Sequence, residues 1–166
     1  MGSWGEGMGS WPEPVARVAS FLEEAKVEAR LEEFPEGTPT AEDAARAAGC
    51  EPSQIVKSLV FVCDRRPVLV MVPGDTRADR RKVAHEVGST KTAVASPDEV
   101  QRVTGFEAGG VAPFPLPAIE VVLIERTLLA GPLVWVGAGS PRHMVALAPS
   151  DLARLSRARP VDAVVQ

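Results

Sequence analysis

Lys57 is the residue whose surroundings point most directly to chemistry. It is the cation within the apolar, β-branched run from Ile55 to Phe61, which predicts an interior strand. A lysine in such a strand costs free energy unless its ammonium is paired or faces a wet cleft. Two glycine-rich segments follow, at residues 109–114 and 137–140. An ammonium beside flexible backbone amides suggests a pocket for an anionic or carbonyl-bearing ligand.

These features also have ordinary structural interpretations. Lys57 could lie along a strand edge with its head in water, and a glycine segment is more often a tight turn than a ligand cradle. His143 could equally be a buried structural histidine or a donor to a substrate group. The helix predicted over residues 77–87 contains four Lys or Arg residues and two acids, which by default form a solvated surface. Contact with a nucleic-acid backbone is the sharper alternative.

Metal and cofactor chemistry find little support in the sequence. The two histidines, His85 and His143, do not pair with a cysteine at ligand spacing. Cys50 follows a predicted helix and Cys63 ends a predicted strand, so we expect both to be small core residues with free thiols. No glycine segment has the spacing of a dinucleotide or phosphate-binding loop. The sequence therefore predicts neither a metal site nor a cofactor.

The composition predicts a globular protein. Hydrophobic residues make up 45% of the 166 residues, so we expect one domain over residues 13–166 after a flexible leader, residues 1–12. The net charge of −4 and the pI of about 5.3 argue against a wide basic surface that grips a duplex, but not against a pocket for one nucleotide end. Neither a signal peptide nor a membrane-spanning run is visible, so we expect a cytoplasmic protein without membrane contact.

Apolar periodicity and turn residues predict an α+β domain of about seven short strands and four or five helices. Thr40 and Ser96 are expected to cap helices. The helices are expected over residues 13–26, 40–48, 77–87, 96–104 and 149–155. The strands are expected over residues 27–34, 55–63, 68–72, 92–95, 119–124, 133–136 and 144–148, with a further strand in the tail 160–166.

An ordered series of motifs carries a family resemblance. It comprises GTPTAEDAA at residues 37–45, IVKSLVF at 55–61, GGVAPF at 109–114, and GAGS at 137–140 followed by LAPSDL at 147–152. With these motifs the chain resembles the YbaK/ProX/EbsC family of free-standing aminoacyl-tRNA deacylases, over roughly residues 15–155. That family is related to the editing domain inserted in bacterial prolyl-tRNA synthetases.

The resemblance implies a compact α+β domain on a mixed, barrel-like sheet. It also implies trans-editing: hydrolysis of the ester that joins a wrong amino acid to the tRNA 3′ end. A synthetase is a further partner to consider, and the oligomeric state stays open. Lys57 matches the key lysine of the family, and Gly109 with Gly110 starts its GxxxP loop, so these three residues are the catalytic candidates. The substrate-binding candidates are Thr40, Val111, Ala112, Pro113, Phe114, Gly137, Ala138, Gly139, Ser140 and His143.

The chain departs from some relatives beside these motifs. Some relatives carry an asparagine or an acidic residue near the key lysine or the second glycine segment, whereas here Ser58 follows Lys57, and Ser140, Pro141 and Arg142 follow Gly139. The substrate choice of those relatives is therefore not transferred to this chain.

An aminoacyl ester is already activated, so water can act as the nucleophile once it is oriented and the oxyanion is stabilised. Proline-rich loops would limit the pocket to a small amino acid such as alanine, serine or cysteine. Two other functions stay open. One is a non-catalytic module that binds tRNA or a synthetase with the same pocket. The other is an enzyme that uses Lys57 as a Schiff-base amine.

Overall fold

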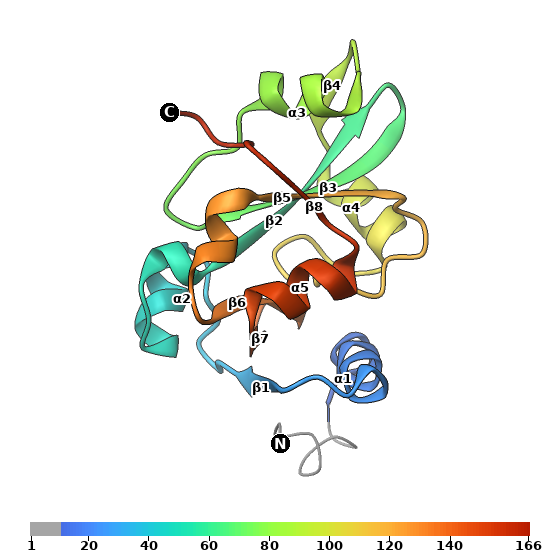
Figure 1. Cartoon of the computed structure of the whole chain (residues 1–166). Coiled ribbons are helices and arrows are strands. Elements are labelled where there is room, and N and C mark those ends of the chain that lie inside the picture. Colours follow the sequence, from blue (N-terminus) through green and yellow to red (C-terminus); the bar gives the residue numbers. More distant parts are fainter. Residues whose placement is uncertain (1–10) are drawn as a thin grey trace.

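The computed structural model describes residues 11–166 (Figure 1). The expected flexible leader, residues 1–12, therefore lies almost entirely outside the described residues. Trp11, near its end, packs against the main hydrophobic core. No helix within residues 11–166 is long and apolar enough to cross a lipid bilayer.

A five-stranded mixed sheet contains the strand that carries Lys57. The predicted hairpin is confirmed: β2 (Val56–Cys63) pairs antiparallel with β3 (Arg66–Pro73). The strand order is β4-β2-β3-β5-β8, so β2 is an interior strand, as expected. β5 lies parallel to β3 and β8, in the central position that its apolar residues predict. The remaining strands of this sheet are β4 (Thr92–Val94), β5 (Val121–Glu125) and β8 (Arg159–Val161).

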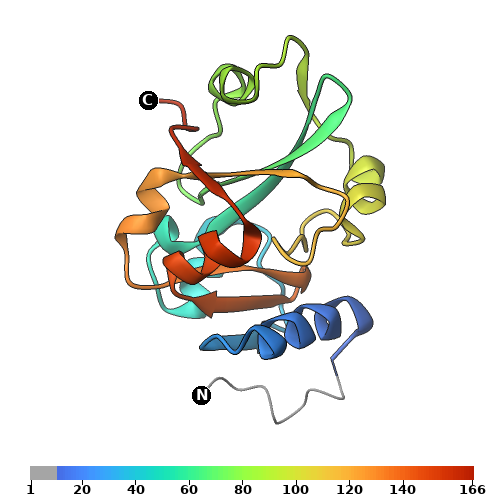
Figure 2. The same ribbon diagram turned by 45° about the vertical axis from the view of Figure 1, so that its right-hand side comes forward.

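A second, antiparallel sheet has three strands in the order β1-β7-β6. They are β1 (Ala29–Glu33), β6 (Val134–Ser140) and β7 (His143–Leu147). Figure 1 shows this sheet below the five-stranded one, and Figure 2 shows helix α1 running beneath it. A bridge between Ile55 and Trp135 links the start of β2 to β6. The α+β class is confirmed, whereas a single barrel-like sheet of seven strands is not, because residues 11–166 form two sheets with eight strands.

The second glycine segment corrects one expectation. The sequence predicts that strands flank a loop at residues 137–140, but these residues are the last part of β6. A bulge between Gly137 and Ser140 shifts the register, and β6 then turns directly into β7. Gly139 has a φ of 109°, which a residue with a side chain rarely adopts. The glycines of this segment therefore belong to the bulged end of β6 and not to a flexible loop.

The helices follow the local sequence signals closely. Thr40 caps α2 through a bond from the Asp43 amide (3.0 Å), and Ser96 and Glu99 form the capping box of α4. α3 begins at Arg80, three residues later than expected, because Asp79 is its cap and Ala78 pairs with Val164. The α-helices are α1 (Glu13–Ala25), α2 (Ala41–Ala48), α3 (Arg80–Val87), α4 (Pro97–Thr104) and α5 (Pro149–Ser156). Short 3-10 helices are η2 (Pro52–Gln54) and η3 (Arg126–Ala130).

The main core lies between the two sheets. α1 buries Val15, Val18, Ala19 and Leu22 in it, in agreement with its helical spacing. A second cluster lies on the other face of the five-stranded sheet, where α3 and the C-terminal residues cover β3 and β5. The five-stranded sheet that carries Lys57 is therefore packed on both of its faces.

Candidate active site

A pocket of about 260 Å³ opens between the two sheets, beside the N-terminal end of α2. Its walls come from five parts of the chain: the approach to α2, the start of β2, the first glycine segment, the end of β6 and the start of β7. Most of its lining is apolar, with a few polar groups among it, as in many ligand sites. The lining residues are Thr38, Pro39, Thr40, Ala41, Ala44, Ile55, Val56, Lys57, Ser58, Leu59, Gly109, Val111, Gly137, Ser140, Pro141, His143 and Met144.

Lys57 is half-buried in the wall of this pocket. Its ammonium Nζ donates to the carbonyl of Thr76. Thr76 is fixed in turn, since its amide and its hydroxyl both donate to the Pro73 carbonyl, at 3.0 and 2.7 Å. Within residues 11–166 no carboxylate forms an ion pair with Lys57. The site therefore holds a positive charge that no protein anion neutralises, as a site for an anionic or carbonyl ligand requires.

The two glycine segments meet at the pocket. The Gly139 amide donates to the Gly110 carbonyl at 2.9 Å. A Cβ atom on Gly137 would lie 2.3 Å from the Val111 carbonyl oxygen, and one on Gly110 would lie 2.6 Å from the Ser140 backbone. Only glycine permits this approach of one backbone to another. Val111 lines the pocket, and its amide has no acceptor among residues 11–166.

Ser140 and His143 form a polar pair across the turn that joins β6 to β7. The Ser140 hydroxyl lies 2.6 Å from His143 Nδ1, and it accepts the Arg142 amide at 3.0 Å. Only 4% of the His143 surface is exposed. Its ring packs edge to face against the Trp11 ring, with the two ring centroids 5.5 Å apart. Burial lowers the pKa of His143, the Arg142 cation lowers it further, and Glu33 opposes both. The imidazole is therefore neutral at neutral pH.

Seven of the thirteen candidate residues line the pocket. They are Thr40, Lys57, Gly109, Val111, Gly137, Ser140 and His143. The other six lie behind it: Phe114 stacks on Phe21 with ring centroids 5.2 Å apart, and the Gly110 amide is engaged by the Glu107 carbonyl at 2.9 Å. These six form the supporting layer and comprise Gly110, Ala112, Pro113, Phe114, Ala138 and Gly139.

Some pocket residues were not among the candidates. Ser58 lines the pocket, and its buried hydroxyl has no hydrogen-bond partner among residues 11–166. Thr38 also lines it and donates weakly to Met144 Sδ at 3.9 Å. The position of Ser58 beside Lys57 was the available signal. However, neighbouring residues of a strand point to opposite faces, so the sequence did not suggest that both would line one pocket.

The comparisons with known proteins agree on one family. The model of the aminoacyl-tRNA editing domain matches residues 35–155. The uncharacterised protein YwhH of Bacillus subtilis (strain 168) is 34% identical over 125 residues, which cover 75% of this chain and 79% of that protein. The proline–tRNA ligase of Desulforamulus reducens is 34% identical over 86 residues, 52% of this chain but 15% of the ligase. The chain thus spans less than a fifth of the ligases that it matches.

A solved structure shares nearly the whole fold. It is described as a candidate trans-editing enzyme for prolyl-tRNA synthetase, with 35% identity and a TM-score of 0.87. The match covers 94% of this chain and 99% of that one. Since the family model alone covers most of the chain, the pocket between the two sheets lies within the matched domain. The chain belongs to the aminoacyl-tRNA editing domain family.

Proposed function

We propose that this protein hydrolyses, in trans, the ester of a mischarged tRNA that carries a small amino acid. One observation carries the proposal: in an aminoacyl-tRNA editing domain, Lys57 and Val111 line one pocket, and among residues 11–166 the Lys57 ammonium has no ion pair and the Val111 amide has no acceptor. A cation and a backbone donor are the groups that an ester with a nearby phosphate and a developing oxyanion would need.

Each group has a distinct role in the proposed reaction. Lys57 holds the terminal phosphate or ribose of the tRNA 3′ end as a point charge. The amides at Gly109 and Val111 stabilise the negative oxygen that forms when water adds to the ester carbon. When the intermediate collapses, the bond from this carbon to the ribose oxygen breaks, and the tRNA leaves with a free hydroxyl. Losing one oxyanion donor of this kind typically costs about 3 kcal/mol.

The reaction as proposed uses no metal, because the ester is already activated and the protein supplies orientation and charge. The pocket, of about 260 Å³, has to hold the amino acid together with the terminal ribose, which supports a small amino acid as the group removed. Size exclusion alone discriminates only about 10–200-fold per methylene group. The Ser140–His143 pair in the pocket wall supplies polar groups that would add selectivity for the amino acid.

A panel of tRNAs charged with alanine, serine, cysteine, proline or threonine tests this function. We expect the protein to release at least one small amino acid at catalytic protein concentrations, before and after dialysis against EDTA. Binding of tRNA without hydrolysis of any member would reject the enzyme and favour a non-catalytic module. Loss of activity on dialysis, restored by a divalent ion, would contradict the metal-independent reaction. A Lys57 adduct trapped by borohydride would instead indicate a Schiff-base enzyme.

A further inference from the structure

A basic segment adjoins the pocket at Lys57. The Thr76 carbonyl that accepts the Lys57 ammonium comes directly before Arg77. From there the chain continues through Arg80 and Arg81 into the first turn of α3. The three arginines are exposed, and none of them forms an ion pair within residues 11–166. The three arginines without an ion pair among residues 11–166 therefore follow directly after Thr76, which binds the Lys57 ammonium.

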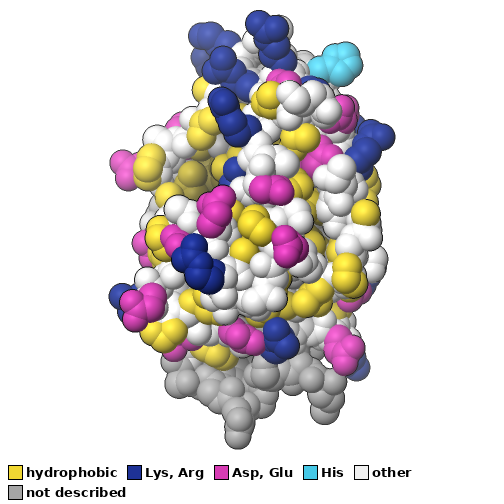
Figure 3. All heavy atoms as spheres, turned by 90° about the vertical axis from the view of Figure 1, so that its left-hand side faces the viewer, with side chains coloured by type: hydrophobic (Ala, Val, Ile, Leu, Met, Phe, Trp, Pro, Cys, Tyr) yellow, Lys and Arg dark blue, Asp and Glu magenta, His cyan; other side chains and the backbone are white. Residues whose placement is uncertain are grey.

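The charge of this segment contrasts with that of the whole chain, which has a net charge of −4. Figure 3 shows Lys and Arg side chains gathered at the top of the face seen there, whereas acidic and basic side chains mix lower down. α3 and the tip of the β2–β3 hairpin form that end of the molecule in Figure 1. Arg65, Arg66 and Lys91, from the hairpin tip and the residue before β4, are exposed as well, with Asp64 as the acid of that tip. The electrostatic potential at this end of the molecule would attract a polyanion.

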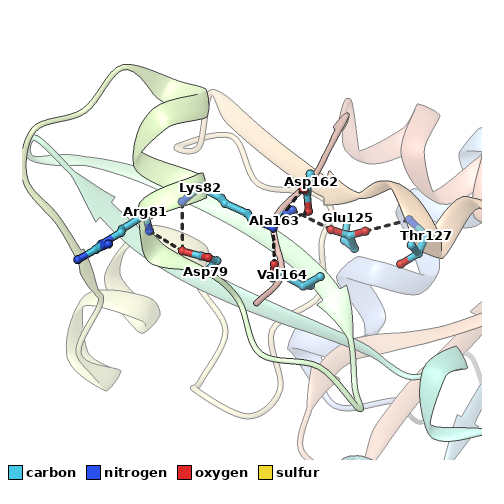
Figure 4. A network of polar contacts seen from close by, with 8 residues as sticks. All are labelled: Asp79, Arg81, Lys82, Glu125, Thr127, Asp162, Ala163 and Val164. Atoms are coloured by element: carbon cyan, nitrogen blue, oxygen red, sulfur yellow. Dashed lines mark hydrogen bonds and ion pairs between the residues drawn. The ribbon is translucent and has the colours of Figure 1, made fainter. Parts of the chain in front are cut away.

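The segment is held rigidly by the C-terminal residues (Figure 4). The Asp79 amide donates to the Ala163 carbonyl at 2.7 Å, and the Val165 amide donates to the Arg77 carbonyl at 2.8 Å. Lys82 is used in the same network, since its ammonium contacts Asp162 at 3.1 Å and the Val164 carbonyl at 2.8 Å. Lys82 thus belongs to the scaffold, whereas the Arg81 side chain points away from it in Figure 4.

We propose that Arg77, Arg80 and Arg81 form a docking surface for the phosphate backbone of the acceptor arm of the tRNA whose 3′ end enters the pocket. This inference rests on the proposed function, and adds to it the path of the nucleic acid. Phosphates are the groups that guanidinium side chains on a fixed backbone bind well. With Lys57 at one end and the hairpin tip about 20 Å along β2 at the other, the surface is long enough for several consecutive phosphates. The local surface also explains how an acidic protein can bind an anion as large as tRNA.

The test compares the binding of deacylated tRNAPro by wild-type protein and by the double variant Arg80→Ala/Arg81→Ala. Fluorescence anisotropy at several salt concentrations gives the Kd and its salt dependence. We expect the Kd of the variant to rise at least about fivefold near physiological salt. The slope of log Kd against log salt should fall by about 1.5, since each lost phosphate contact removes about 0.7–0.9. The matched control Arg126→Ala/Arg154→Ala removes the same charge from η3 and α5, and it should leave both quantities nearly unchanged.

The outcomes separate this surface from the proposed hydrolysis. Equal Kd values and slopes for the two double variants, or no measurable tRNA binding by the wild type, would overturn the surface. If the arginines act only on the arm, the Arg80/Arg81 variant should release the amino acid from a charged CCA trinucleotide at the wild-type rate. An equal loss on this short substrate would also overturn the surface. Wild-type protein that binds tRNA as predicted but hydrolyses no charged tRNA would refute the hydrolysis and leave the surface standing.

Discussion

At the scale of single residues, the pocket combines a cation that is not neutralised with a buried base that is held neutral. Among residues 11–166 the Lys57 ammonium donates only to the Thr76 carbonyl, whereas His143 contacts the Ser140 hydroxyl and the Trp11 ring. The first group can attract an anionic substrate, and the second can exchange hydrogen bonds with it without adding charge.

The lowered pKa of His143 predicts a pH dependence of stability. The unfolded chain protonates this imidazole near its ordinary pKa of 6.5, whereas the folded chain keeps it neutral to lower pH. The unfolded state therefore binds the additional proton as the pH falls below about 6.5, and the free energy of unfolding should decrease from there down to the folded pKa. Urea unfolding at pH 7.5 and at pH 5.5 measures this decrease.

The variant His143→Gln provides the comparison, because its side chain is polar but does not titrate. We expect its stability to fall less than that of the wild type between the two pH values. An equal loss in both proteins would mean that His143 does not contribute to the acid sensitivity.

At the scale of elements, the close contact of the two glycine segments predicts that a side chain at Gly137 is not tolerated. Gly137→Ala would put a methyl group 2.3 Å from the Val111 carbonyl oxygen, so β6 and the first glycine segment must move apart. We expect a loss of about 1–3 kcal/mol in the free energy of unfolding, measured by urea titration. Gly131→Ala is the matched control, since nothing lies within 4 Å of its added Cβ and its φ is −89°. Equal stability of the two variants would show that the backbones tolerate separation.

Local elements could be predicted from the sequence better than their long-range pairing. The predicted cap at Ser96 is confirmed, because it depends on four consecutive residues: Ser96 and Glu99 form a capping box with bonds of 2.7 and 3.1 Å. The separation into two sheets was missed, because β1 pairs with β7 far along the chain. The same difference holds for the pocket residues. Local motifs pointed to Lys57 and the glycine segments. Ser58 was overlooked because its part in the wall depends on how the two sheets pack.

At the scale of the whole molecule, the C-terminal residues connect the sheet that carries Lys57 to the basic segment beside it. Glu125, only 2% exposed, accepts the Ala163 amide at 2.7 Å and the Thr127 amide at 3.2 Å (Figure 4). Ala163 in turn accepts the Asp79 amide. One buried carboxylate thus anchors the chain end that holds the start of α3.

The variant Glu125→Gln tests this connection. Its amide group keeps one acceptor but turns an N–H donor toward a backbone donor, which should cost about 1–3 kcal/mol of unfolding free energy. Hydrogen exchange at the Asp79 amide should become faster, because its acceptor belongs to the loosened segment. The exposed Glu120→Gln is the control and should stay within about 0.5 kcal/mol of wild type. Unchanged exchange in the Glu125 variant would show that the C-terminal residues hold α3 without this carboxylate.

The most direct test of the account is the rate at which Lys57→Met hydrolyses the best substrate of the charged-tRNA panel. Methionine keeps most of the length of the side chain and removes its charge. We expect kcat/KM to fall at least about 100-fold, while the melting temperature stays close to that of wild type. Lys26→Met, which removes the same charge from the exposed end of α1, should retain full activity. A folded Lys57→Met protein with wild-type activity would contradict the central role of this ammonium.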